Sequence, residues 1–457
     1  MSSKAIEFAQ QNQSRFLEEL KDFLRIQSVS TLPEHKPDIL AAANKLAGEL
    51  TRIGFEHVEL IDNGGNPLVY GDWLHAAGKP TALAYGHYDV QPVEPLEEWK
   101  TKPFEPTQIG DDLFGRGGSD DKGQVWMQVK AFESLFLTSG GKLPINVRCI
   151  FEGEEETTGA SIEKFVSEHP ERLKSDFALI ADTELFAKGL PTLCVGLRGN
   201  VYYEVEVQAA ATDLHSGMYG GAAPNPIFAL AEIFTKIKDE NGHILIPGFY
   251  DDVKVPTDAE LAAWKALPFD EEHYRKTEVG SDVLTGEPGY SVLYRTWARP
   301  TFEVHGIVGG FVGNGAKTVI PAKATAKVST RLVPDQDPEK AVEQFSKYVK
   351  SIAPKGTKVS IRVLSKGPAS VVSTDSPFIK AASAALQEVF HKETVYVRSG
   401  GSIPIAAQFQ SDLGIPSVMM GFGLPDDNIH APNEKFHLPN YFHGIESMIR
   451  FLSNLGQ

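Results

Sequence analysis

The stretch TALAYGHYDV, residues 81–90, decides the fold, because it joins a short apolar run to a histidine and an aspartate. Short apolar runs also occur at Ile145–Phe151, Phe177–Ala181 and Pro416–Met420. Such runs are typical of buried strands, and in open α/β sheets ligands bind outside the carboxyl ends of the strands. Because a polar segment follows each run, we expect the loops after these strands to converge.

Five polar segments carry residues that can bind a hard or borderline metal ion: GHYDV at 86–90, GRGGSDDKG at 115–123, EGEEE at 152–156, ADTE at 181–184 and NIHAP at 428–432. A catalytic zinc takes about four mixed N and O ligands, and two ions about 3.5–4 Å apart need a bridging carboxylate and a bridging water. His87 and Asp182 can serve one ion. His430 and Glu156 can serve the other, and Asp120 can bridge the two.

Two acidic residues are left over after this ligand count. Asp89 lies two residues from His87, so we expect it to hold the imidazole through the nitrogen that is not on the metal. Glu155 neighbours a ligand yet must point differently, which makes it the natural general base for the bridging water.

Each segment also has an ordinary structural interpretation. Runs of glutamates are usually solvated surface, Asp120 can be only a helix N-cap, and Asp182 and His430 can be turn residues. The acidic run, however, directly follows an apolar strand, and the joint occurrence of all five segments is hard to obtain from structural needs alone.

The bulk composition restricts the class of protein. The chain has 457 residues, a net charge of −16, 42% hydrophobic residues and two cysteines. A soluble globular protein of two domains is the default, and the acidic charge argues against nucleic acid or an anionic membrane as partner. Cys149 and Cys194 lie in apolar runs, which favours buried reduced thiols. Neither a secretory stretch nor a transmembrane span is expected, so the predicted location is cytoplasmic.

The order of predicted elements indicates an α/β chain with an insertion. Ala5–Ile26 and Pro37–Ile53 are predicted helices, and strands then alternate with helices to Asp182. A β-α-β-β-α-β-like pattern follows, with the half-exposed strand Val201–Val207 near its start. We expect this strand to offer an edge for pairing across a two-fold axis. We therefore expect residues 1–197 and 371–457 to form one domain and residues 198–370 an inserted α+β domain.

These motifs together resemble the co-catalytic zinc peptidase family that includes cytosolic non-specific dipeptidase, carnosinase, aminoacylase and succinyl-diaminopimelate desuccinylase. The resemblance covers nearly the full length. It implies a catalytic domain with a mixed sheet flanked by helices and an inserted lid and dimerisation domain. It implies that Glu155 is the base, that the peptide bond between Asp120 and Asp121 is cis, and that the metal ligands are His87, Asp120, Glu156, Asp182 and His430. An alignment slipped by one residue would make Glu154 the base and Glu155 the ligand.

Three further segments resemble the dipeptidase branch of the family: YRTWARPT at 294–301, GAKTVIP at 315–321 and RLVP at 331–334. Within this resemblance, Arg331 grips the C-terminal carboxylate of the substrate, and Ser402, Gly401 and Thr318 assist it. The resemblance also implies that His215 is the oxyanion stabiliser that a partner subunit donates. From the residues alone, Arg331 can equally be an ion-paired strand residue and His215 a turn residue.

The expected function is metal-dependent hydrolysis of dipeptides or short peptides by a homodimer with two divalent ions per chain. Zinc is the expected ion and manganese the alternative. A deacylase of N-acyl amino acids is the rival within the same chemistry, and a non-catalytic metal-stabilised scaffold is the rival from another class. A calcium-binding protein is disfavoured, because calcium prefers oxygen-only ligands in a compact loop.

Overall fold

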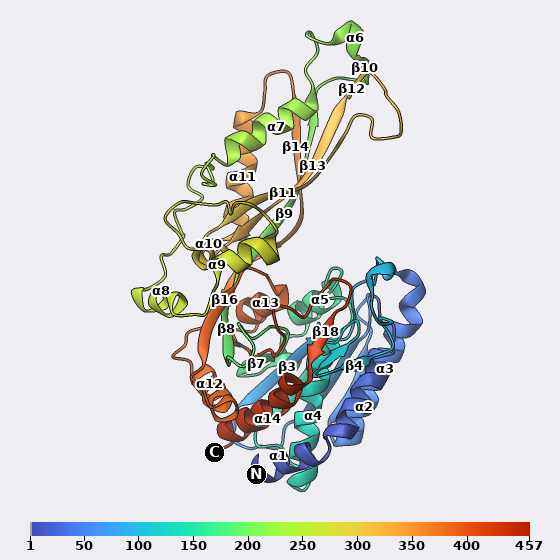
Figure 1. The fold of residues 1–457 in the computed structure, drawn as a ribbon, viewed down its shortest axis with the longest axis vertical. Coiled ribbons are helices and arrows are strands. Elements are labelled where there is room, and N and C mark those ends of the chain that lie inside the picture. Colours follow the sequence, from blue (N-terminus) through green and yellow to red (C-terminus); the bar gives the residue numbers. More distant parts are fainter. Residues whose placement is uncertain (1) are drawn as a thin grey trace. The chain divides into compact units, whose positions relative to one another are not determined.

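The computed structural model describes residues 2–457, so residue 1, where the first predicted domain segment begins, lies outside the described residues. The chain divides into two compact units, both drawn in Figure 1. Unit 1 extends to Val195 and also contains Val372–Val397 and Gln408–Gln457. Unit 2 contains Gly196–Val371 and Arg398–Ala407.

The central strands of unit 1 belong to a mixed nine-stranded sheet with the order β1-β2-β6-β3-β7-β17-β8-β15 and with β16 paired to β8. The end strand β15 lies within the residues of unit 2. Strands β6, β3, β7 and β17 run parallel to one another, whereas β2 is antiparallel to β6 and β8 is antiparallel to β17. The strands are β1 (Glu56–Ile61), β2 (Leu68–Trp73), β3 (Thr81–His87), β6 (Asn146–Glu152), β7 (Phe177–Ile180), β8 (Thr192–Leu197), β15 (Ser370–Val371), β16 (Val395–Ser399) and β17 (Ser417–Met419). All four apolar runs are therefore strands of one sheet, and their carboxyl ends lie at the same edge.

Helices pack against this sheet, and most of the central helix α4 is enclosed. Every residue of α4 from Lys122 to Phe136 is buried. The helices of this part of the chain are α1 (Ser2–Gln11), α2 (Gln13–Leu24), α3 (Lys36–Ile53), α4 (Lys122–Thr138), α5 (Ala160–Glu168), α12 (Pro377–Phe390), α13 (Pro404–Asp412) and α14 (Leu438–Leu455), with short turns η1 (Pro33–His35), η2 (Leu96–Glu98) and η3 (Pro170–Leu173). A small sheet of β18 (Lys435–His437), β5 (Asp112–Phe114) and β4 (Thr107–Ile109) completes unit 1.

The N-terminal helix differs from its prediction. The single helix predicted over Ala5–Ile26 is two helices, α1 and α2, which meet at Asn12. The backbone of Asn12 leaves helical geometry, with φ −106° and ψ 10°, and its side-chain amide donates to the carbonyl of Phe8 over 2.8 Å. A short polar side chain that bonds the local backbone competes with the helical ladder, so hydrophobic periodicity alone does not reveal the break.

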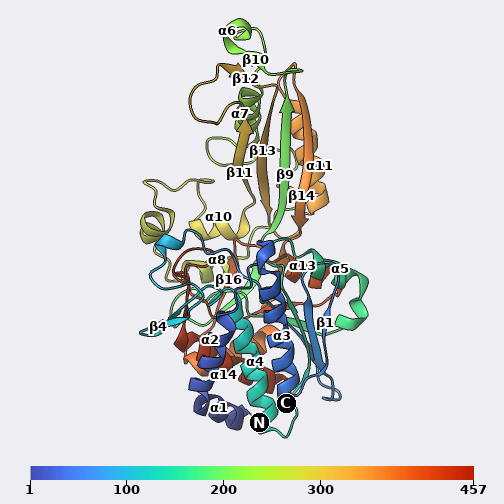
Figure 2. The ribbon, with the colours of Figure 1, turned by 90° about the vertical axis from the view of Figure 1, so that its right-hand side faces the viewer.

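Unit 2 is an antiparallel sheet covered on one face by two helices. Its elements follow the order β9 (Gly199–Gln208), α7 (Pro226–Ile237), β11 (Thr301–Gly309), β13 (Lys323–Leu332), α11 (Pro338–Ile352) and β14 (Lys358–Gly367). The sheet order is β11-β13-β9-β14. Figure 2 shows α7 and α11 alongside this sheet, and both helices contribute buried residues to one core with β9 and β13.

The sheet order corrects one expectation about its edges. Val201–Val207 was expected to offer an edge for pairing, but it belongs to β9, which lies between β13 and β14. The edges are β11 and β14. Alternation predicts which face of a strand is buried, whereas neighbours in the sheet are set by tertiary pairing.

The remaining elements of unit 2 are short. The irregular stretch between residues 241 and 300 contains α8 (Asp258–Lys265), α9 (Glu271–His273), the π-helical turn η4 (Tyr274–Val279) and α10 (Val292–Ala298). β10 (Leu214–His215) and β12 (Val319–Ile320) form a separate two-stranded sheet, and α6 (Ser216–Tyr219) directly follows β10 in the sequence. Within residues 2–457, none of the helices has the length and apolar character that a membrane span requires.

Candidate metal centre

The candidate ligands lie at one edge of the central sheet of unit 1. His87 is the last residue of β3, Glu156 follows β6, and Asp182 is the second residue after β7. Asp120 lies in the loop just before α4, and its peptide bond to Asp121 is cis, as the resemblance implies. Because these strands are parallel, the loops after them meet at the same edge.

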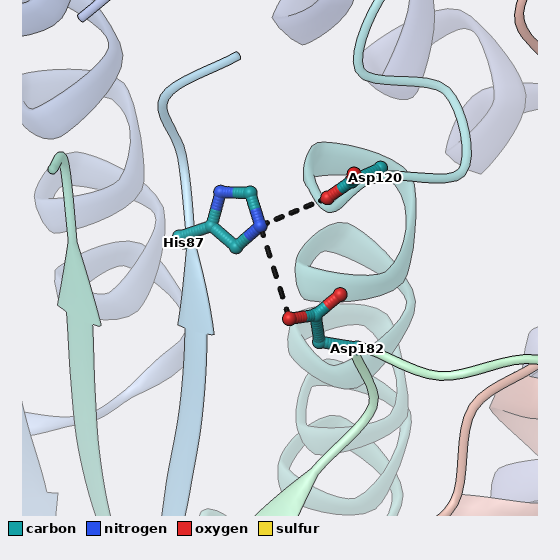
Figure 3. Close-up of side chains that lie close together, drawn as sticks. All are labelled: His87, Asp120 and Asp182. Atoms are coloured by element: carbon teal, nitrogen blue, oxygen red, sulfur yellow. Dashed lines mark hydrogen bonds and ion pairs between the residues drawn. The ribbon is translucent and has the colours of Figure 1, made fainter. Parts of the chain in front are cut away.

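The first group of ligand atoms surrounds His87 (Figure 3). The Nε2 atom of His87 lies 3.0 Å from Oδ1 of Asp120 and 3.9 Å from Oδ2 of Asp182. The histidine side chain is fully buried, and the two carboxylates are 12% and 17% exposed. These three residues are the ones that the sequence assigns to the first ion, with Asp120 as the bridge.

The second group surrounds His430. The Nε2 atom of His430 lies 2.9 Å from Oδ2 of Asp120 and 3.2 Å from Oε2 of Glu156. The Glu156 side chain is almost buried, whereas that of His430 is about half exposed. Asp120 therefore belongs to both groups, with one oxygen directed at each histidine.

Residues of this kind fit a pair of metal ions. In each group the ligand atoms all lie within 4.8 Å of one another, and each group offers one imidazole nitrogen with carboxylate oxygens, the mixture that zinc accepts. Burial raises the pKa of Asp182 to about 7, because a buried carboxylate near Asp120 and Glu156 resists ionisation. Acids crowded in this way need cations nearby to remain charged.

The same carboxylates also raise the pKa values of the two histidines. Hydrogen bonds to Asp120 and Glu156 raise the pKa of His430 to about 10. Burial lowers the pKa of His87, but its carboxylate neighbours outweigh burial, so the pKa lies well above its ordinary value. The same contacts hold the pKa of Asp120 below its usual range, although burial opposes this. The field of the site thus strongly favours positive charge.

Asp89 contacts one residue of each group. The Nδ1 atom of His87 lies 3.1 Å from the carbonyl oxygen of Asp89 and 3.4 Å from its Oδ1. The other oxygen of the Asp89 carboxylate accepts the backbone N–H of Glu156 over 3.1 Å. Because a carbonyl only accepts, Nδ1 of His87 carries the proton and Nε2 is left for a ligand role.

The acidic run places its glutamates in different surroundings. Glu156 joins Asp120 and His430. Burial raises the pKa of the Glu155 carboxyl well above its ordinary value, and the charges of His87 and Asp182 also act on this pKa. Glu154 instead accepts the backbone N–H of Ser161 in α5 over 3.3 Å. This geometry favours the register in which Glu156, not Glu155, is the ligand.

Sequence reasoning missed two residues that contact the candidate ligands. Gln91 donates from its side-chain amide to Oε2 of Glu156 over 2.7 Å. Glu434 accepts the backbone N–H of Asp120 over 3.1 Å. The signal for Glu434 was an acid four residues after His430, and a lone acid in a loop is too common to be informative.

Three of the expected carboxylate-binding residues, Arg331, Ser402 and Gly401, meet within unit 2, whereas Thr318 lies beside His215. Nη1 of Arg331, in β13, donates to Oγ of Ser402 over 2.8 Å, and Ser402 donates to the carbonyl of Arg198 over 2.5 Å. The backbone N–H of Arg198 donates to the carbonyl of Gly401 over 3.1 Å. Burial lowers the pKa of Arg331. Arg198 was not predicted, although it connects two of the residues that were.

His215 and Thr318 lie next to each other in the two-stranded sheet of β10 and β12. His215 is opposite Val319, and the N–H of Ser216 donates to the carbonyl of Thr318 over 3.0 Å. The His215 side chain is exposed, and its Nδ1 accepts the backbone N–H of Gly217 over 3.0 Å. In the neutral imidazole this leaves the proton on Nε2.

Comparisons with known proteins identify the family of the chain. The model of "Peptidase family M20/M25/M40" matches residues 83–454. The chain is 33% identical to the Cys-Gly metallodipeptidase DUG1 of Candida albicans, over 97% of this chain and 95% of that protein. It is 30% identical to the Beta-Ala-His dipeptidase of Homo sapiens, over 99% of this chain and 92% of that protein.

A solved structure of a protein of this family also matches the chain. The M20 family metallo-carboxypeptidase Sso-CP2 from Sulfolobus solfataricus superposes with a TM-score of 0.87 at 32% identity, over 96% of this chain and 99% of that one. The fold and the site thus define a metal-dependent peptidase. The chain belongs to peptidase family M20/M25/M40. The predicted family and fold class, a mixed-sheet α/β domain with an inserted α+β unit, are confirmed.

Proposed function

We propose that this peptidase hydrolyses dipeptides and other short peptides that have a free C-terminal carboxylate, with two divalent ions bound per chain. The observation that carries the proposal is Asp120, whose two oxygens lie 3.0 Å from Nε2 of His87 and 2.9 Å from Nε2 of His430. Two relatives are named as dipeptidases. Zinc is the expected ion, and manganese is the alternative that the carboxylates also suit.

Some residues of the chain are proposed to hold the ions, and Glu155 is proposed to transfer a proton. When bound, the ions polarise the scissile carbonyl and lower the pKa of water. Glu155 belongs to neither ligand group, so its carboxylate is free to take a proton from the attacking water and to pass it to the leaving amine. Asp89 keeps the His87 ring oriented through Nδ1.

Arg331 is proposed to receive the C-terminal carboxylate of the substrate. A guanidinium presents a planar pair of donors that matches a carboxylate. One nitrogen of Arg331 is anchored on Ser402, and no carboxylate of residues 2–457 pairs with this guanidinium within 4.0 Å, so an anionic ligand would supply the missing partner. Gly401 is proposed as a further contact to the same group. Thr318 lies beside His215 and precedes β13, whose far end carries Arg331, so it is proposed to contact the substrate together with His215 from a second copy of the chain.

His215 is proposed to stabilise the developing oxyanion in the active site of a second copy of the chain. Its Nδ1 accepts the backbone N–H of Gly217, which fixes the tautomer with a proton on the free Nε2. A donor of known orientation is what oxyanion stabilisation requires. The role predicts that a site is incomplete without its partner copy.

A homodimer formed through unit 2 follows from this role. Edge strand β11 exposes Ile307 and Val308, and α7 exposes Phe228, with 47%, 70% and 76% of these side chains accessible. An unpaired strand edge beside exposed apolar side chains is typical of an interface. Cys149 and Cys194 are buried and form no disulfide, which supports a reducing compartment such as the cytoplasm as the location.

A substrate panel tests the function directly. Dipeptides, tripeptides, N-acetyl and N-succinyl amino acids are assayed with added zinc and, separately, with added manganese. We expect dipeptides to have the highest kcat/KM and a chelator to abolish turnover. Faster hydrolysis of N-acyl amino acids than of every dipeptide would replace the peptidase assignment with deacylation, and turnover that survives complete metal removal would overturn the mechanism.

A further inference from the structure

The carboxylate of Glu434 is buried under the loop that carries Asp120. Its Oε1 accepts the backbone N–H groups of Ser119 and Asp120, each over 3.1 Å. Its Oε2 accepts the backbone N–H of Gly117 over 3.0 Å and Nη1 of Arg116 over 2.7 Å. The residue is fully buried. Two acceptor positions on each oxygen are therefore filled, and the carboxylate has a single fixed placement.

The backbone around Glu434 is tied to the same loop. The N–H of Gly115 donates to the Glu434 carbonyl over 2.9 Å. The next residue, Lys435, begins β18 and pairs with Phe114 of β5. Arg116, which neutralises the Glu434 charge, is itself buried and donates from Nη2 to the Pro92 carbonyl over 3.0 Å. The buried charge pair thus has the additional hydrogen bonds that make burial tolerable.

A second carboxylate, that of Asp427, precedes His430 in the sequence and also contacts the loop that carries Asp120. Asp427 accepts Oγ of Ser119 over 2.9 Å and the N–H of Leu424 over 2.8 Å. The N–H of Lys435 donates to the Asp427 carbonyl over 3.0 Å. Asp427 and Glu434 therefore bracket His430 in sequence, and both hold the segment that ends at Asp120.

We propose that Glu434 is a positioning residue that fixes the Asp120 loop against the His430 loop and thereby sets the affinity of the chain for both metal ions. The inference rests on the proposed function, because it takes Asp120 as the shared ligand. The N–H of Asp120 itself donates to Glu434, so the placement of the backbone that carries the shared carboxylate depends on this residue. Partners that orient metal ligands change metal affinity by about 10–100-fold when they are removed.

The test is the equilibrium affinity for Zn²⁺ alone, measured on the full chain by competition with a chromophoric chelator. In Glu434→Gln, one oxygen is replaced by an NH₂ group that must face N–H donors, so the loop cannot keep its placement. We expect the dissociation constants of both ions to rise by about 10–100-fold. Glu434→Asp keeps the charge beside Arg116 but is one methylene shorter, and we expect a smaller rise of the same kind.

The matched control is Glu133→Gln, which also neutralises a buried, arginine-paired carboxylate. Glu133 pairs with Arg15 over 2.8 Å and with Arg52 over 2.9 Å, and it contacts none of the candidate ligands through these bonds. We expect this variant to lower the Tm of the metal-free protein and to leave Zn²⁺ affinity unchanged. Circular dichroism of each metal-free variant verifies that it is folded.

The outcomes separate the inference from the proposed function. Unchanged Zn²⁺ affinity in both Glu434 variants, with a lowered Tm, would show that Glu434 only stabilises the fold and would overturn the proposal. If Glu434→Gln does not fold, the folded Glu434→Asp variant decides the question in the same way. A wild-type chain that binds no Zn²⁺ would instead refute the proposed function.

Discussion

The Nε2 atom of His430 lies 2.9 Å from Oδ2 of Asp120, although Asp120 belongs to the segment 115–123 and His430 to the segment 428–432. The other oxygen of the same carboxylate faces His87. A single side chain therefore connects the two groups of ligand atoms, and the loss of Asp120 should have consequences that the loss of either histidine does not.

Asp120→Ala is expected to weaken both metal sites, whereas His430→Ala is expected to weaken mainly one. The reason is that Asp120 belongs to both ligand groups and His430 to only one. The metal content of each purified variant after dialysis against a weak chelator measures the difference. A wild-type chain that is fully active with one ion per chain would contradict the two-ion arrangement.

Glu155→Gln is expected to lower kcat by about 10²–10⁴-fold while the metal content stays nearly normal, because an amide cannot accept the proton of the water. Glu154→Gln is the matched control, since Glu154 accepts the N–H of Ser161 instead of facing the ligands. We expect that control to retain turnover. The opposite result, an inactive Glu154→Gln and an active Glu155→Gln, would show that the slipped register is correct.

C-terminal amidation of a dipeptide is expected to lower kcat/KM by an amount equivalent to roughly 2–3 kcal/mol, because the buried guanidinium of Arg331 is left without its anionic partner. Arg331→Ala should remove this discrimination, and Arg331→Lys should restore it only in part. Steady-state kinetics with the acid and the amide of one dipeptide provide the comparison. Equal kcat/KM values for both substrates in the wild type would refute the proposed role of Arg331.

Mixed dimers test the role of His215. His215→Ala and Glu155→Gln chains are each expected to be inactive, but a mixture of the two should regain part of the activity, because one of the two sites in a mixed dimer has both an intact base and an intact histidine. The mixture is assayed after subunit exchange, and sedimentation gives the oligomeric state. A fully active monomer would contradict the dimer.

The acid dependence of stability is predicted from Glu49. Burial raises the pKa of this residue, but hydrogen bonds and charge interactions with Arg52 and Lys130 outweigh burial and lower it to about 2 from 4.5. A lowered pKa in the folded state means that the stabilisation is present above pH 4.5 and is lost as the pH falls from 4.5 towards 2. Glu49→Gln should therefore destabilise the protein by roughly 1–2 kcal/mol at pH 7.

The same pair of proteins provides the check. Thermal unfolding of the wild type and of Glu49→Gln is followed from pH 7 to pH 2.5, and the difference in Tm is expected to shrink below about pH 4.5. A difference in Tm that stays constant across this range would show that the ionised carboxylate of Glu49 contributes nothing to stability.

Several features could be predicted from the sequence with good precision. The apolar run before His87 predicted a buried strand, and β3 extends from Thr81 to His87. The helix predicted after Pro37 closes at Gly54, which adopts φ +117°. These features depend on local chemistry, since buried parallel strands are apolar throughout and a glycine accepts a left-handed backbone at a helix end.

Other features were beyond the reach of the sequence. The break at Asn12 depends on one side-chain hydrogen bond to the carbonyl of Phe8. The interior position of β9 depends on its pairing with both β13 and β14. Neither changes the hydrophobic periodicity of its segment, and that periodicity is what the predictions used.

The sequence by itself determined which residue types stand after which strands, and hence a set of imidazoles and carboxylates suited to two metal ions. Only the tertiary structure decided which oxygen of Asp120 faces His87 and which faces His430, and that Glu434 holds the loop between them. The physical reason is the distance along the chain over which each property is set. Strand polarity and ligand type are local properties of a segment, whereas the placement of a shared carboxylate within about 3 Å of two histidines depends on contacts between loops that meet only when the chain has folded.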